Sequence, residues 1–66
     1  MYVLREQREY AVVEAAQEEH AAWSDLERAI RPDVEDEAAV RAYKQRWRVA
    51  SRRLIEALEA LKNVRR

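Results

Sequence analysis

The strongest candidates for an exposed functional surface in this 66-residue chain are four basic residues: Arg41, Lys44, Arg48 and Arg52. Their spacing places them on one face of a helix, in a row about 16 Å long at a rise of 1.5 Å per residue. No acidic residue occurs between positions 41 and 53. This set, the basic stripe, has the charge and spacing to hold a nucleic-acid backbone or to contact an acidic partner.

His20 is the only histidine, and its neighbours do not form a metal-binding pattern. The chain has no Cys, and position 17 is Gln where a Glu-x-x-His pair requires Glu. We therefore expect no metal and no cofactor, and a half-buried His20 hydrogen-bonded to a neighbouring acid such as Glu18 or Glu19. The alternative is a symmetric dimer that joins two copies of His20 through a metal or a pH-sensitive contact.

Catalytic patterns are missing from the sequence. The only hydroxyl residues besides the tyrosines are Ser24 and Ser51, and neither has a base at a useful helical offset. The chain contains no Gly from which a phosphate-binding loop could be built. We expect no enzymatic activity and no small-molecule substrate.

Composition predicts an all-α protein. The chain has no Gly, one Pro and no Cys, and strong helix formers such as Ala, Glu, Arg and Leu dominate it. No apolar run is long enough to span a bilayer, and charged residues, Arg5 and Glu6 among them, lie where a signal peptide would be apolar. We expect a cytoplasmic protein without membrane contact, formed as a single domain over residues 1–66.

A heptad pattern predicts that the second half of the chain is one long helix that packs against another helix. Every seventh residue from Val40 is large and apolar, and the positions three residues further on are also apolar. The two sets are Val40, Trp47, Leu54 and Leu61, followed by Tyr43, Ala50, Ala57 and Val64. Such a seam is typical of a coiled coil and must be covered by a partner helix. Leu58 flanks the seam and should widen it.

Pro32 marks the expected turn. Proline pushes the preceding Arg31 out of helical geometry, and Asp33 is a suitable N-cap for the next helix. We predict helix 1 over about 3–30, a turn at 31–33 and helix 2 over about 34–64, packed as an antiparallel helical hairpin. The alternative is a separate short helix that starts at the capping-box sequence of residues 24–27.

Helix 1 carries a less regular apolar stripe that should cover the seam. Its members are Val12, Val13, Ala16, His20, Trp23, Leu26 and Ile30. With the turn centred on Pro32, residue i should face residue 64 − i, so Trp47 should meet Ala16 and Gln17, and Trp23 should meet Ala38, Ala39 or Ala42. The chain is near the lower size limit for an independent core, so we expect a homodimer that forms a four-helix bundle.

The expected function is that of a small adaptor, regulator or inhibitor that binds another protein through helix packing. The alternative is a nucleic-acid-binding regulator that uses the basic stripe. The net charge of zero disfavours a dedicated DNA-binding protein, and it conceals two oppositely charged halves. Residues 1–31 contain four basic and seven acidic side chains, whereas residues 32–66 contain nine and six.

Overall fold

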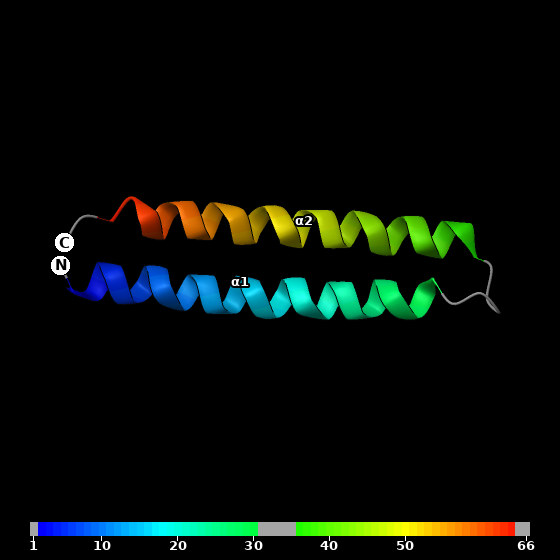
Figure 1. The fold of residues 1–66 in the computed structure, drawn as a ribbon, viewed down its shortest axis with the longest axis horizontal. Coiled ribbons are helices and arrows are strands. Elements are labelled where there is room, and N and C mark those ends of the chain that lie inside the picture. The colour runs from blue at the N-terminus through cyan, green and yellow to red at the C-terminus, as the bar shows by residue number, and fades with distance from the viewer. Residues whose placement is uncertain (1, 31–35, 65–66) are drawn as a thin grey trace.

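The computed structural model describes residues 2–30 and 36–64, and the side chains of residues 4–30 and 36–64. Two helices, α1 (Tyr2–Ala29) and α2 (Glu37–Lys62), run antiparallel and side by side (Figure 1). The Cα atoms extend over 51 × 13 × 11 Å. Within the described ranges there is no strand, so the predicted all-α hairpin is confirmed.

The first helix continues without interruption through the capping-box sequence of residues 24–27. A separate short helix is therefore not formed there. On the exposed surface of α1, Arg5 forms an ion pair at 3.3 Å with Glu9, four residues later. Ion pairs at this sequence spacing stabilise a helix on their own. At the other end, the Ile30 N–H donates to the Leu26 oxygen at 3.1 Å and closes the last turn.

The second helix is capped at both ends. Asp36 is the N-cap of α2, and its carboxylate accepts a hydrogen bond from the Ala39 N–H at 3.1 Å. Sequence analysis expected Asp33 in this role and helix 2 to begin near residue 34; Asp33 and the predicted turn at 31–33 lie outside the described residues. At the carboxyl end, the Asn63 N–H donates to the Glu59 oxygen at 3.0 Å.

The heptad seam of α2 faces α1. Ala50 is buried, and the other seam residues are half-buried: Val40, Tyr43, Trp47, Leu54, Ala57, Leu61 and Val64. Leu58 differs, because 47% of its surface is exposed although sequence analysis assigned it to the core. It lies beside the seam, and one helix is too narrow to cover that position.

The matching seam on α1 shares Val12 and Leu26 with the predicted stripe and otherwise lies one residue away from it. Its buried members are Ala15, Ala22 and Leu26, and its half-buried members are Val12, Glu19 and Ala29. Ala16 is half-buried beside this seam. The hairpin itself does not bury Trp23 and Ile30, which are 40% and 54% exposed. The reason is that small residues, chiefly alanine, occupy the face of α1 that meets the large side chains of α2.

The contacts between the helices are shifted from the predicted register by two to seven residues. The smallest shift is that of Glu19, which contacts Trp47 where the rule 64 − i gives residue 45. Trp23 contacts Trp47, whereas the rule 64 − i places it opposite Arg41, six residues earlier. Cross-helix pairs of Asp25 with Arg46 and of Glu18 with Arg53 show a similar shift. One cause is the break between the helices, which extends from the end of α1 at Ala29 to the start of α2 at Glu37 and is wider than predicted. The other is that helical side chains lean toward the amino end of their own helix, which raises both residue numbers in an antiparallel contact.

Candidate interaction surfaces

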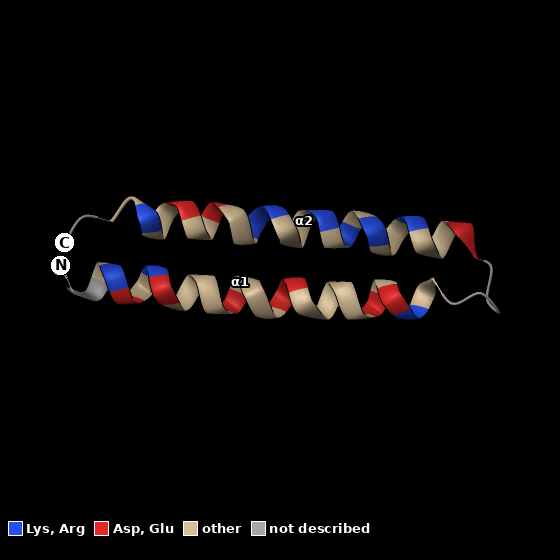
Figure 2. Cartoon of the chain, in the orientation of Figure 1, with Lys and Arg blue, Asp and Glu red and all other residues tan. Residues whose placement is uncertain are grey.

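Charge is separated by helix. The α1 sequence contains seven acidic and three basic residues, whereas that of α2 contains seven basic and three acidic residues (Figure 2). Two ion pairs cross between the helices: Arg46 with Asp25 at 3.9 Å and Arg53 with Glu18 at 3.8 Å. We call these four residues the charged flank. Their heptad positions immediately precede the seam residues Glu19, Leu26, Trp47 and Leu54.

A polar contact between Trp47 and Glu19 lies within the seam. The Trp47 indole Nε1–H donates to the Glu19 carboxylate at 2.7 Å, and this contact is partly buried. The indoles of Trp23 and Trp47 lie 5.4 Å apart at an interplanar angle of 55°. The Arg46 guanidinium lies 5.3 Å from the centre of the Tyr43 ring, one turn away on α2. Glu19 therefore satisfies the indole donor that burial against α1 would otherwise leave without a partner.

The opposite side of the seam carries five of the eight exposed large apolar residues. Each heptad has two seam positions, the first represented by Trp47 and the second by Ala50. In an antiparallel helix pair, the residues just before the first seam position lie on one side of the seam in both helices, and the residues just after the second lie on the other side. The charged flank occupies the first side. The second side, including the next positions outward, holds both charged and apolar residues. Its six apolar residues, which we call the apolar flank, are Val13, Ala16, Trp23, Ile30, Ile55 and Leu58. All except Ala16 are large side chains with 40–54% of their surface exposed.

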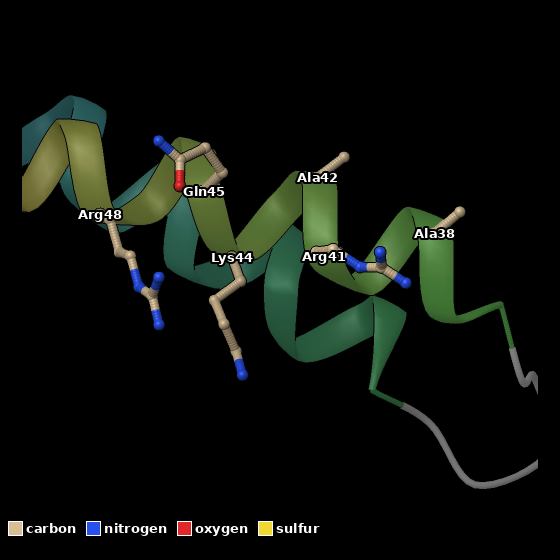
Figure 3. Close-up of a pocket in the computed structure, with 6 residues that line it drawn as sticks. All are labelled: Ala38, Arg41, Ala42, Lys44, Gln45 and Arg48. Carbon is tan, nitrogen blue, oxygen red and sulfur yellow. The ribbon is translucent and has the colours of Figure 1, made fainter.

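The basic stripe is exposed along α2, as the spacing predicted. Arg41 and Arg48 share the heptad position of Ile55, so the stripe borders the apolar flank. Arg41, Lys44 and Arg48, with Ala38, Ala42 and Gln45, line a shallow open depression (Figure 3). Lys44 and Arg48 extend in the same direction, whereas the Gln45 side chain projects away from them (Figure 3). All four stripe residues are exposed, and none forms an ion pair with a described residue. Arg46 and Arg53, in contrast, face the acidic helix.

His20 is exposed, which corrects the expectation of a half-buried residue with an acidic partner. It lies on the outer edge of the apolar flank, one turn from Trp23 and one heptad from Val13. Within residues 2–30 and 36–64, no group of three His, Cys, Asp or Glu side chains is arranged to hold a metal ion. Neither helix, over its described length, has a stretch long and apolar enough to cross a membrane.

Glu19 is the residue that sequence analysis missed. It was expected only as a possible hydrogen-bond partner of His20, but the structure places it in the seam as the acceptor for Trp47. The signal was available in the heptad spacing, because position 19 is seven residues after Val12 and seven before Leu26. Hydrophobicity alone favoured the neighbouring stripe that contains Val13, Trp23 and Ile30.

Comparison of the chain with protein-family models, with curated proteins and with solved structures found no match.

Proposed function

We propose that this protein is a non-enzymatic interaction module, a small adaptor, regulator or inhibitor that acts through helix packing. The observation that supports this proposal is that the hairpin buries few apolar residues and leaves many large ones exposed. Among the described residues only four are buried, and three of these are alanines. Eight large apolar residues are exposed: Leu4, Tyr10, Val13, Trp23, Ile30, Val49, Ile55 and Leu58. A helical hairpin with so much uncovered apolar surface is suited to bind other helices.

Self-association is the first part of the proposal. The chain exposes 5753 Å², whereas a compact monomer of 7.9 kDa is expected to expose about 4,400 Å². The difference, roughly 1,300 Å² per chain, exceeds the 800 Å² or so that each partner contributes to a standard interface. We therefore propose a homodimer in the form of a four-helix bundle, in which the second hairpin supplies the missing cover.

The second part is an acidic protein partner for the basic stripe. The stripe residues have no ion-pair partner among the described residues, and an array of exposed guanidinium and ammonium groups favours carboxylate-rich surfaces. The same four charges support the alternative function, a nucleic-acid-binding regulator. The two candidates differ in the ligand that is preferred and in how steeply its binding weakens with salt.

The first experiment is sedimentation equilibrium from about 1 μM to about 1 mM, with circular dichroism on the same samples. A helical dimer whose thermal unfolding midpoint rises with concentration supports the proposal. A folded helical monomer throughout this range overturns the homodimer. An unfolded monomer would instead mean that another protein covers the apolar flank.

The second experiment compares a fluorescent Glu-rich helical peptide with a fluorescent DNA duplex, using anisotropy at several salt concentrations. The test variant replaces the basic stripe (R41Q/K44Q/R48Q/R52Q), and the matched control replaces two exposed arginines of the charged flank (R46Q/R53Q). Preference for the peptide, lost only in the stripe variant, supports the acidic partner. Preference for DNA with a log–log salt slope of about −0.9 per phosphate contacted supports the alternative. Binding of neither ligand overturns both uses of the stripe.

A further inference from the structure

We infer that a second copy of this chain docks on the apolar flank, with the two-fold axis parallel to the helices, so that α1 of each copy packs against α2 of the other. This inference rests on the proposed self-association and assigns it a face and a geometry. All four helices then share one level along the bundle, and both turns lie at the same end.

The apolar flank can pair with itself in this geometry. A two-fold rotation about an axis parallel to the helices moves no residue along them, so each residue of α1 meets the same level of α2 in the second copy as in its own chain. The register set by Trp23 with Trp47 and by Asp25 with Arg46 places Val13 at the level of Leu58 and within one turn of Ile55. These three exposed side chains would therefore form an apolar contact between the copies.

Charge at the rim of the flank favours the same geometry. Glu6 and Glu27 lie on its α1 edge, one and two heptads from Val13. Its α2 edge holds Lys62, one heptad from Ile55, and Arg41, two heptads from Ile55, which is also the first residue of the basic stripe. All four are exposed, and none forms an ion pair with a described residue. The same register brings Glu27 within one helical turn of Arg41 in the second copy, and Glu6 within one turn of Lys62. Acid therefore faces base at both ends of the apolar contact.

The other two-fold arrangement of two such faces places the axis perpendicular to the helices. In that case α1 packs against α1 and α2 against α2. The α1 edges would bring Glu6 of one copy toward Glu27 of the other, and the α2 edges would bring the basic residues together. Since like charges across an interface disfavour association, the separation of charge by helix selects the parallel axis.

The face is tested with Ile55→Asp, matched to Val49→Asp. Both residues are large, exposed and on α2, at 53% and 42% exposure, but Val49 lies off the apolar flank. Because each dimer contains two copies of the substituted side chain, I55D should weaken dimerisation about 100-fold or more in sedimentation equilibrium. V49D should leave it within about threefold. Equal effects of the two variants, with helicity retained, would overturn the assigned face.

The geometry is tested by cysteine crosslinking. The chain has no cysteine of its own, so only the introduced cysteines can form disulfides. V13C is refolded with I55C and, separately, with H20C, and each mixture is oxidised with diamide. The parallel axis predicts mixed disulfide dimers of V13C with I55C. The perpendicular axis predicts mixed dimers of V13C with H20C, because positions 13 and 20 lie on either side of the middle of α1.

The outcomes separate this inference from the function on which it rests. A dimer that survives I55D, or that crosslinks through V13C and H20C, overturns the inference and leaves the homodimer standing. A chain that remains monomeric up to about 1 mM overturns both. A dimer that I55D dissociates, and that links V13C to I55C, supports both.

Discussion

The indole of Trp23 on α1 packs against the indole of Trp47 on α2, with ring centroids 5.4 Å apart and planes inclined by 55°. The two rings differ in environment, because Trp47 is half-buried in the seam whereas Trp23 is 40% exposed on the apolar flank. Tilted aromatic pairs of this kind contribute about 0.5–1.5 kcal/mol beyond the area that they bury. The pair therefore joins the seam of the hairpin to its uncovered side.

Replacement of Trp47 by Ala should destabilise the hairpin by about 2–4 kcal/mol, because it removes the largest seam side chain and its aromatic neighbour contact. Tyr10→Ala, at a site that is 65% exposed, is the matched aromatic control and should cost less than about 0.5 kcal/mol. The measurement is urea unfolding by circular dichroism at one fixed protein concentration. A loss below about 1 kcal/mol for W47A would contradict the assigned seam.

Glu19 should contribute stability through its hydrogen bond to the Trp47 indole, 2.7 Å long and partly buried. We expect Glu19→Ala to cost about 1–2 kcal/mol and Glu19→Gln, which keeps an acceptor oxygen, to cost about half as much. Glu14→Ala, an exposed acid of the same helix, is the control. Tryptophan fluorescence gives a second readout, because only the Glu19 variants should shift the emission of Trp47.

In the charged flank, reversing the charge of the arginines should affect stability more than removing a single charged side chain. Single removal of Arg53 or Glu18 should change stability by less than about 0.5 kcal/mol, because the side chains are 66% and 59% exposed. Reversal of both arginines (R46E/R53E) places like charges across the helices and should lower the thermal midpoint at low salt. Added salt should reduce that loss through screening. A loss that persists unchanged at 1 M salt would indicate a packing defect instead.

The N-cap of α2 is open to a simple test. Asp36→Ala removes the acceptor for the Ala39 N–H and should cost about 1 kcal/mol, whereas Asp36→Asn should restore most of it. Thermal unfolding followed at 222 nm measures both. If D36A and D36N are equally destabilised, the loss comes from charge at the helix end and not from the cap hydrogen bond.

Helix 2 was predictable from sequence because its seam is both periodic and apolar. Val40, Trp47, Leu54 and Leu61 each recur after seven residues, and no competing stripe on α2 is as hydrophobic. The two-helix hairpin followed from that seam and from Pro32, and it is confirmed. The basic stripe was also predictable, since helical spacing alone fixes which side chains share a face.

The seam of helix 1 was harder to predict, because two heptad stripes lie one residue apart on this helix. The stripe with Val13, Trp23 and Ile30 is the more hydrophobic, but the seam uses Ala15, Glu19 and Ala22. The choice depends on the partner helix, whose indole requires small neighbours and an acceptor for its N–H. Single-sequence hydrophobicity contains no information on that requirement. The register depended on the width of the break and on side-chain lean, and neither can be read from Pro32.

The separation of charge by helix also bears on how the chain folds. An extended chain with an acidic arm and a basic arm is drawn together at long range, before any apolar contact forms, and two copies of the same arm repel one another. Closing the hairpin is therefore a directed encounter and not a random search. Its rate should depend on ionic strength more strongly than its final stability does, since the native ion pairs are few and exposed.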